Sequence, residues 1–505
     1  MKTVINVLTN WAAIFLGMAI TFVLSPFVVH QLGDTRYGLW AVVGSLVGYL
    51  GLLDLGIRVG VTRFVARHEA HGDKDAANQL VSTALALFAV VGVIAATLGV
   101  VLSLNLPRFV NAPPEFLREA SIAVAIAGFS IAVSLVSGVY GAVIAGLQRF
   151  ALLNGIDLSA EVVRAVATYV SLKNGAGLIT LAFIQLAIVS ARGICYLIAT
   201  RRLQPWLRVA RQFYDRTTRA EIIQFSTYTT LLHVSAMVVF SSDALVIAAI
   251  MPVSQVAFFV IGGNLSQAAL QVLSGVNRVL FPLMSSRQAS DGMTGAMLLV
   301  RNSVRLGSLV LLPIVFTFLA RGQTFIGIWM GPSYAGPAGE VLQILALGLC
   351  VFASYQVFTI SIMALNLHRG LVPAYAGEAA ANIGLSFLLG SWMGVAGVAW
   401  GTTIPRIALA MCFAPWYAKR KLGLSVRDYA VNAWLRPLAS MIPFAALSLL
   451  IDRRWPTSSM LAFFGQVILI LPVAITGTWL VGLEDAERQQ LLDWLRARRR
   501  SARLA

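Results

Sequence analysis

Apolar runs long enough to cross a membrane recur along the whole chain, from residue 4 to residue 482. About 20 helical residues span a hydrocarbon core of about 30 Å. The 505-residue sequence is 58% hydrophobic and only 12% charged, whereas a soluble domain is typically about 25% charged. Backbone groups in lipid must be hydrogen-bonded within their own segment. The sequence therefore predicts an all-α polytopic membrane protein.

We predict about fourteen transmembrane helices. The first, 4–29, exceeds the apolar core of about 7–15 residues in a signal peptide and lacks a small-residue cleavage site, so we expect it to be retained. Spans 155–172 and 221–249 carry charges, and 304–320 is short. The predicted spans are 4–29, 39–57, 80–104, 120–146, 155–172, 177–199, 221–249, 255–284, 304–320, 341–365, 371–390, 394–415, 435–451 and 460–482.

The distribution of basic residues predicts the orientation. With a cytoplasmic N-terminus, most Lys and Arg residues fall in cytoplasmic segments, above all 200–220, 416–436 and 483–505. The positive-inside rule then places both termini in the cytoplasm. It also explains the net charge of +17 without a nucleic-acid partner. The opposite side holds Arg36, Arg108, Arg118, Lys173, Arg321, Arg453 and Arg454.

Two cytoplasmic segments, 200–221 and 483–505, mix Trp, Leu or Phe with many Arg residues. Each is compatible with a helix lying on the anionic inner leaflet or with a solvated basic segment. The sequence alone leaves both alternatives open.

The two halves of the chain echo each other at an offset of 219–220 residues. Six spans per repeat give both repeats the same orientation, related by a pseudo-two-fold axis along the membrane normal. Transporters of this kind bind substrate between the halves and work by alternating access. The paired positions are Arg58 with Arg278, Leu147 and Arg149 with Leu367 and Arg369, Gly175 with Gly394, and Arg201–Arg202 with Arg420–Lys421.

This repeat predicts the domain organisation. We expect two six-helix lobes joined by a linker, then two additional spans and a basic tail. The predicted parts are an N-terminal lobe 1–199, a cytoplasmic linker 200–220, a C-terminal lobe 221–415, two further spans in 416–482 and a cytoplasmic tail 483–505.

Charged residues inside the spans are the first candidates for function, because a charge near the bilayer centre costs about 2.5–3.5 kcal/mol on insertion scales. In IDLSAEVVRA (156–165), Asp157, Glu161 and Arg164 are spaced i, i+4 and i+7 and share one helix face. Arg192 lies at a similar depth in the next span. These residues bind substrate or carry a coupling ion, or Glu161 forms a structural ion pair with Arg164 or Arg192.

The second half repeats this arrangement with Glu378 and Arg406 in adjacent spans. The same two interpretations apply: a structural ion pair, or participation in transport.

A second set of charges lies near the ends of other spans and comprises Asp54, Arg58, Asp243 and Arg278. Arg58 can alternatively extend to the interface, whereas Arg278 has apolar neighbours on both sides. His233 is either a group that titrates near neutral pH or a neutral, hydrogen-bonded core residue.

Catalytic and metal-binding patterns are missing from the sequence. It contains no GxxxxGK[ST] phosphate loop, no Ser-His-Asp or Cys-His pattern, and no extramembrane segment much longer than about 20 residues. We therefore expect no enzyme and no ATP-driven pump. Cys195, Cys350 and Cys412 are scattered within spans, so we expect small core residues and no metal site.

Two stretches resemble the polysaccharide transporter family, the Wzx-type flippases of lipid-linked oligosaccharides. They are LSPFVVHQLGDTRYGLWAVVGSLVGYLGLLDLGIRVGVTRFVA (24–66) and FIGIWMGPSYAGPAGEVLQIL (325–345). The LG-x-x-x-YGLW turn, LLDLGI and GLQRF are the characteristic pieces, and the likeness extends to about residue 420. This family belongs to the multidrug/oligosaccharidyl-lipid/polysaccharide (MOP) exporter superfamily, with the multidrug MATE exporters and the lipid II flippases.

The resemblance implies a flippase in the bacterial cytoplasmic (inner) membrane. It would move an undecaprenyl-pyrophosphate-linked oligosaccharide from the inner to the outer leaflet for O-antigen, capsule or exopolysaccharide synthesis. Spans one, two, seven and eight line the cavity in such proteins, which would place Asp54, Arg58, His233, Asp243 and Arg278 there. Arginine suits a pyrophosphate because its donors are bidentate and it stays charged.

The acids Asp54, Asp157, Glu161, Asp243 and Glu378 would balance the arginines or carry a coupling ion. The first span holds no acidic residue, so coupling-ion assignments from MATE exporters do not transfer. We expect no cofactor and leave coupling to H⁺ or Na⁺ open.

Two other functions remain open. An ion-coupled exporter of multidrug or organic-cation substrates would have the same fold, but its cavity should be lined by acids and aromatics, whereas Arg164, Arg192, Arg278 and Arg406 favour an anionic substrate. A non-transporting scaffold of the glycan assembly machinery would tolerate loss of these arginines. We expect a monomer whose partners, besides substrate and membrane lipids, are the polysaccharide polymerase and glycosyltransferases of the pathway. The sequence does not indicate the sugar.

Overall fold

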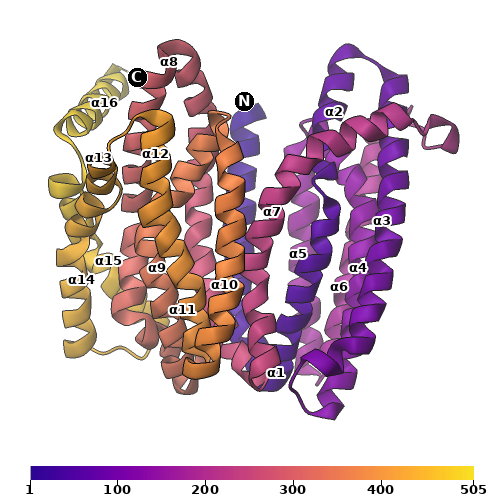
Figure 1. Cartoon of the computed structure of the whole chain (residues 1–505), viewed down its shortest axis with the longest axis horizontal. Helices are drawn as coiled ribbons and strands as arrows, with labels where there is room; N and C mark the ends of the chain where they lie inside the picture. The colour runs from indigo at the N-terminus through magenta and orange to yellow at the C-terminus, as the bar shows by residue number, and fades with distance from the viewer. Residues whose placement is uncertain (1, 505) are drawn as a thin grey trace. The chain divides into compact units, whose positions relative to one another are not determined.

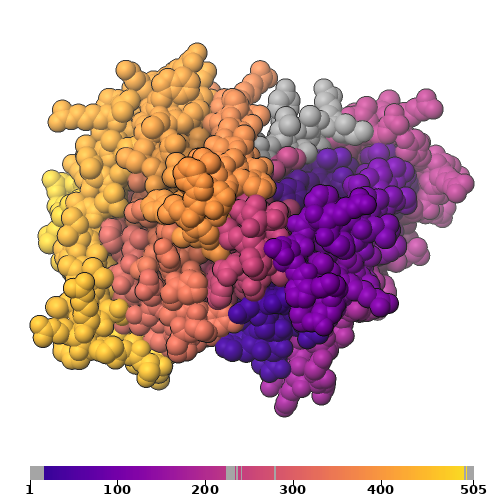
Figure 2. All heavy atoms as spheres, turned by 60° about the horizontal axis from the view of Figure 1, so that its bottom comes forward, coloured from indigo at the N-terminus to yellow at the C-terminus, as the bar shows by residue number. Residues whose placement is uncertain are grey.

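The computed structural model shows an all-helical chain over residues 2–504, with no strand among these residues (Figure 1). This confirms the predicted fold class. Side chains are described except at residues 1–15, 223–233, 235–236, 240, 278–279, 282, 494–495 and 497–505 (Figure 2).

The helices follow the predicted apolar runs closely. The first half contains α1 (Lys2–Gly51), α2 (Ile57–His71), α3 (Lys74–Phe109), α4 (Pro114–Gly146), α5 (Phe150–Lys173), α6 (Leu178–Leu203) and α7 (Arg216–Ile250). The second contains α8 (Ser254–Met330), α9 (Pro332–Ala364), α10 (Leu371–Met393), α11 (Val395–Ala408), α12 (Ala414–Leu422), α13 (Val426–Ala430), α14 (Arg436–Arg454), α15 (Met460–Gly477) and α16 (Asp485–Leu504). The short elements are η1 (Leu52–Asp54), η2 (Arg211–Phe213), η3 (His368–Gly370), η4 (Leu409–Phe413), η5 (Val431–Leu435) and η6 (Thr478–Gly482).

Ten helical segments of the described chain are long and apolar enough to cross a membrane, so the protein is a multi-pass membrane protein. One of them, Leu16–Asp54, overlaps the first two predicted spans. The helix α1 bends between these spans at Gly33, whose φ of 71° and ψ of 165° suit glycine. The predicted spans on α5, α7 and α10 are helical but fall outside the ten. The count of fourteen spans is therefore not confirmed.

The chain divides into two compact units, residues 1–257 and 258–505. This division differs from the predicted lobe boundary at 220/221 because α7 packs against α1, α2 and α3. In the first unit, α4 packs against α3 and α6 (Figure 1). A Cβ at Gly99 of α3 would lie 2.7 Å from the Cα of Gly128 in α4, so these two helices approach closely where both residues are glycine.

The backbone supports the internal repeat. Helices α4 and α9 both contain 33 residues and begin with proline. Each is followed by a left-handed residue, Gln148 with φ 56° and Asn366 with φ 57°. Gly175 and Gly394, which the sequence pairs, also share positive φ values of 78° and 64°. Each unit therefore contains the same succession of helix, turn and helix.

One predicted register within the repeat is wrong. The sequence pairs Leu147 with Leu367, but Leu147 and Leu365 are the residues that directly follow α4 and α9. The turn before α10 contains the additional element η3, whereas α5 begins at Phe150, two residues after Gln148. The sequence offset between the two halves is therefore shorter at the ends of α4 and α9 than at the starts of α5 and α10.

The linker after α6 is mostly extended rather than helical. Its backbone is tied to side chains of α3: the N–H of Arg208 donates to Asn78 Oδ1 (2.8 Å) and that of Asp215 to Thr83 Oγ1 (3.0 Å). Asn78 and Thr83 are buried polar residues, and these bonds satisfy them. The helical alternative for 200–221 is thus wrong over residues 204–215, apart from the short η2, whereas the C-terminal tail does form a helix, α16.

Ion pairs join segments that were predicted to lie on the same side of the membrane. Arg36 Nε lies 3.1 Å from Glu119 Oε2, and both residues belong to the sparsely charged side. Arg301 Nε lies 3.1 Å from Asp428 Oδ2, and both belong to the basic side. Which of the two sides is cytoplasmic remains a prediction from the loop charge.

Candidate functional site

Arg58 is held between α2 and α4 by three groups. Its Nε lies 2.7 Å from Asp54 Oδ2, and its Nη2 donates to the carbonyl of Ser134 (3.1 Å). A Cβ at Gly138 would lie 2.6 Å from Arg58 Cζ, so only glycine leaves room for the guanidinium there. This arrangement fixes the guanidinium between the two helices instead of leaving it to extend freely toward the interface.

Asp157 joins α5 to α6. The hydroxyl of Tyr196 donates a hydrogen bond to its carboxylate, and Arg192 Nη1 lies 3.8 Å from Asp157 Oδ1. The Tyr196 ring packs on Gly141 of α4. Sequence reasoning missed Tyr196. The available signal was its position one helical turn after Arg192, on the same face.

Glu161 pairs with Arg164 on its own helix, where Arg164 Nε donates to Glu161 Oε2 (3.0 Å). Of the two partners left open for Glu161, the structure selects Arg164. Arg192 instead pairs with Asp157.

These three ion pairs remain partly exposed. Their six side chains retain between 27% and 42% of their accessible surface. Charges in a membrane segment face protein or a water-filled space and not lipid. Contact with water would accommodate these charges at low cost.

The equivalent charges in the second unit are different. Arg406 and Glu378 side chains are only 6% and 3% exposed, and Arg406 Nε lies 3.9 Å from Glu378 Oε1. Arg406 Cζ also lies 5.3 Å from the centre of the Phe352 ring. A buried, mutually neutralised pair of this kind is hard to reach for a substrate.

The remaining predicted residues fall into two groups. Asp243 is buried in α7, within electrostatic reach of Tyr49 on α1. The side chains of His233 and Arg278 lie outside the described residues, so their proposed roles stay predictions.

Arg305 of α8 was missed as a structural residue. Its side chain is completely buried. It donates to Asn432 Oδ1 (2.6 Å), lies 2.9 Å from Glu484 Oε1 and forms an ion pair with Glu487. Arg305 therefore fastens the segments before α14 and after α15 to α8. The available sequence signal was the presence of Glu484 and Glu487 just after the last predicted span.

Arg321 also attaches other segments to α8, at a position farther along this helix. Its side chain is also fully buried; its Nε donates to Asp452 Oδ1 (3.0 Å) and its Nη2 to Gln466 Oε1 (2.5 Å). Its Cζ lies 4.4 Å from the centre of the Phe463 ring. Because Asp452 lies on α14 and the other two partners lie on α15, Arg321 attaches both helices to α8.

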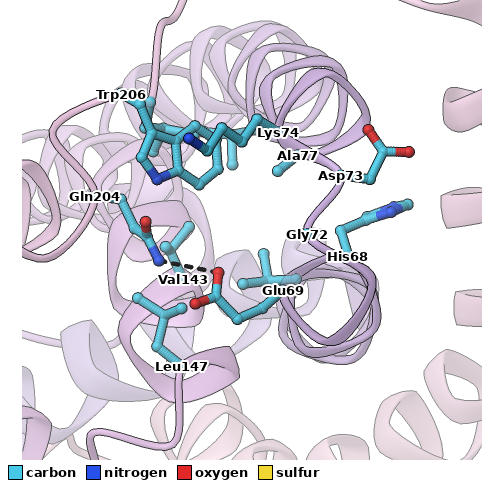
Figure 3. A pocket seen from close by; sticks show the side chains of 13 residues that line it. His68, Glu69, Gly72, Asp73, Lys74, Ala77, Val143, Leu147, Gln204 and Trp206 are labelled. Atoms are coloured by element: carbon cyan, nitrogen blue, oxygen red, sulfur yellow. Dashed lines mark hydrogen bonds between the residues drawn. The ribbon is translucent and has the colours of Figure 1, made fainter.

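A small cavity lies where the linker crosses the first unit (Figure 3). Its volume is about 160 Å³. Gln204 Nε2 donates to Glu69 Oε2 (3.0 Å), and Lys74 Nζ lies 5.7 Å from the centre of the Trp206 ring. Burial lowers the pKa of His68 on its rim, although the charge of Asp73 opposes this shift. With acids and bases mixed, this cavity does not favour an anion.

The family follows from comparison with known proteins. Residues 32–338, more than half of the chain, match the model of a family described as polysaccharide biosynthesis protein. The chain belongs to this family. The matched region begins within α1, includes the three ion pairs of α2, α5 and α6, and extends into α9.

Two relatives match most of the chain. The uncharacterized membrane protein EpsK of Bacillus subtilis (strain 168) is 22% identical over 446 residues, 84% of each chain. A provisionally named O-antigen transporter of Shigella flexneri is 19% identical over 396 residues, 78% of this chain and 92% of the relative.

Solved structures show the same fold at low identity. The lipid II flippase MurJ in an inward closed conformation has a TM-score of 0.72 at 13% identity, covering 94% of this chain and 98% of MurJ. An inward-facing MATE multidrug transporter has a TM-score of 0.64 at 14% identity, covering 82% and 98%. The chain thus shares the fold of these two proteins, as the sequence resemblance implied.

Proposed function

We propose that this protein is a flippase for lipid-linked oligosaccharide. It would carry an undecaprenyl-pyrophosphate-linked glycan from the inner to the outer leaflet by alternating access. The observation that supports this most is the set of three partly exposed arginines, Arg58, Arg164 and Arg192, on helices of an apolar membrane domain. The family and the names of the relatives point in the same direction.

The pairing of these arginines suggests how an anion would bind. Each has one carboxylate partner, so the set is neutral at rest. A pyrophosphate would compete with the carboxylates for the guanidinium donors, which suit phosphate as well as carboxylate. A displaced carboxylate would then be left without its counter-charge, a state that protonation or Na⁺ binding relieves. Ion coupling would follow from this exchange.

The membrane potential would add to the driving force. A headgroup with two negative charges that leaves an inside-negative cell gains about 2.3 kcal/mol per charge per 100 mV. Positive charge that moves outward with it would reduce this gain. Cations entering through the displaced acids would increase it.

The exporter of organic cations is the second candidate, because the MATE structures share the fold. A cation would need an acid that is free to bind it. In the described part of the chain, Asp54, Asp157, Glu161 and Glu378 are each paired with an arginine. This pairing favours the anionic substrate.

The buried pair of Arg406 and Glu378 would then be structural. Its low exposure and its contact with Phe352 support this assignment. The partly exposed pairs of the first unit are the better candidates for substrate contact.

The test is surface glycan in a strain whose own flippase is deleted. Arg58→Ala should abolish surface glycan while the protein stays in the membrane, and Arg58→Lys should restore only part of it because an ammonium lacks the bidentate fork. Arg149→Ala, a change at an exposed arginine in the turn before α5, is the control and should leave surface glycan normal. Normal surface glycan with Arg58→Ala would contradict the proposal. Protection of the cells against cationic dyes by the wild-type chain would favour the exporter.

A further inference from the structure

A second and larger pocket lies in the second unit, where the turn between α9 and α10 meets α12. Its volume is about 600 Å³. Three cations and three aromatic side chains dominate its lining, and none of the lining residues is acidic. These six residues are Arg369, Arg420, Lys421, Phe413, Trp416 and Tyr417.

The aromatic wall of the pocket is built by close packing. The hydroxyl of Tyr417 donates to the carbonyl of Leu367 (2.6 Å), which ties α12 to the turn. Any side chain at Gly370 would clash with the Tyr417 ring. The rings of Phe413 and Tyr417 stack, with centroids 5.3 Å apart and an interplanar angle of 25°. The wall is therefore fixed without a ligand.

The cations of the pocket are not neutralised by the protein. Within the described part of the chain, no carboxylate lies within ion-pair distance of Arg369, Arg420 or Lys421. Arg420 stacks on Trp416, with its Cζ 5.5 Å from the ring centre. Three unpaired positive charges around one hollow form a site for an anion with several oxygens, such as a phosphate.

The surroundings of the pocket indicate a lipid. Trp and Tyr side chains prefer the headgroup level of a membrane, and Trp416 is half exposed. The helices that lead away from the pocket, α10 and α11, expose apolar side chains, among them Phe387, Leu388 and Ile404. Acyl chains would meet apolar surface along the helices that extend from the basic headgroup site.

We propose that this pocket binds the phosphate of an anionic phospholipid of the bilayer. On the orientation predicted from the loop charges, it opens to the cytoplasmic leaflet, whose anionic lipids attract basic clusters. The site shares no residue with the three ion pairs of the first unit, so it would bind a resident lipid and not the transported one. The proposal does not depend on the transport activity.

The test uses the purified full-length protein in detergent and counts bound lipids by native mass spectrometry. Phosphatidylglycerol is titrated in, and phosphatidylcholine, which has a phosphate but no net charge, serves as the comparison. The variant Arg369→Ala/Arg420→Ala should bind phosphatidylglycerol roughly thirtyfold more weakly, because it loses two basic residues that each contribute about fivefold to the binding of an anionic lipid. Its melting temperature shows whether it is folded.

A matched control removes two arginines from the corresponding places of the first unit. Arg149→Ala/Arg201→Ala changes the turn before α5 and the end of α6, and it should bind phosphatidylglycerol as the wild type does. If the pocket variant is unfolded, Lys421→Gln alone at an exposed position should still weaken binding several-fold.

Three results would overturn the proposal. The first is equal weakening by the control variant, which would indicate attraction by net charge alone. The second is binding of phosphatidylcholine as tight as that of phosphatidylglycerol. The third is displacement of the lipid by inorganic phosphate at the same concentration, which would make the pocket a site for a soluble anion.

Discussion

Replacing Arg321 with methionine should loosen the last two membrane helices from the rest of the second unit. Methionine fills much of the space of the aliphatic stem but removes the guanidinium. Asp452 would then keep only the hydroxyl of Thr324, which donates to its Oδ2 at 3.0 Å. The carbonyl oxygen of Gln466 would lose its donor.

The expected cost is about 3 kcal/mol. Removing one partner of a buried ion pair typically costs about 3–5 kcal/mol because the other charge stays behind. The lower end applies because the Asp452 side chain keeps 22% of its surface exposed, so water relieves part of the loss. Loss of the contact with Phe463 adds about 0.5–2 kcal/mol, and the methionine's own packing offsets part of it. A change of 3 kcal/mol corresponds to roughly a hundredfold shift in a local opening equilibrium.

Hydrogen exchange of the purified protein measures this opening directly. Amides of α14 and α15 should exchange roughly a hundredfold faster in Arg321→Met, while those of α3 and α4 should be unchanged. Arg321→Met/Asp452→Asn should recover part of the protection because no charge is left behind. Arg453→Met, at the exposed neighbour of Asp452, should change little. Unchanged exchange in Arg321→Met, or equal acceleration by Arg453→Met, would show that Arg321 does not attach α14 and α15 to α8.

Two further predictions concern other ion pairs, and a third concerns Arg278. Burial raises the pKa of Glu484, but the charges and hydrogen bonds of Arg305 and Arg301 outweigh this effect, so the pKa lies below its usual range. The resulting stabilisation is present above the unfolded pKa and is lost as the pH falls through the lowered one, so hydrogen exchange should show α16 amides losing protection in acid. Asp157→Asn and Arg192→Gln should each reduce the amount of folded protein in membranes, and the double variant should recover part of it; strictly additive losses would show that the two residues do not interact. Arg278→Ala should leave the protein in the membrane but stop surface glycan, with partial rescue by Arg278→Lys, and normal glycan would remove Arg278 from the site.

The helices were predictable because each apolar run needs internal hydrogen bonds in a membrane. The repeat pairs Gly175 with Gly394, which follow α5 and α10, and both adopt positive φ in the structure. The pairing of charges was only partly predictable. Neighbours on one helix, such as Glu161 and Arg164, follow from spacing, whereas the choice of Asp157 by Arg192 depends on how α5 and α6 pack.

Burial of Arg321 was not predictable from the sequence. Arg321 ends an apolar run, and the sequence places it in a loop on the sparsely charged side. Its partner Asp452 is 131 residues away in the sequence, and the residues next to Arg321 give no indication of this contact. The helical prediction for the linker was wrong for a similar reason. The basic and apolar residues of the linker fit a surface helix, but Asn78 and Thr83 of α3 accept hydrogen bonds from its backbone and hold it extended.

The turn that precedes α10 differs from its counterpart before α5 in containing η3, His368–Gly370. If the two halves arose by duplication of one ancestral gene segment, this turn is a place where the copies diverged. Both turns carry an arginine, Arg149 and Arg369, but the second turn also has Gly370, whose lack of a side chain admits the ring of Tyr417. The turn before α5 would thus have remained a simple connection, while the turn before α10 became part of the proposed lipid pocket. Lipid binding would then act on only one of the two equivalent halves.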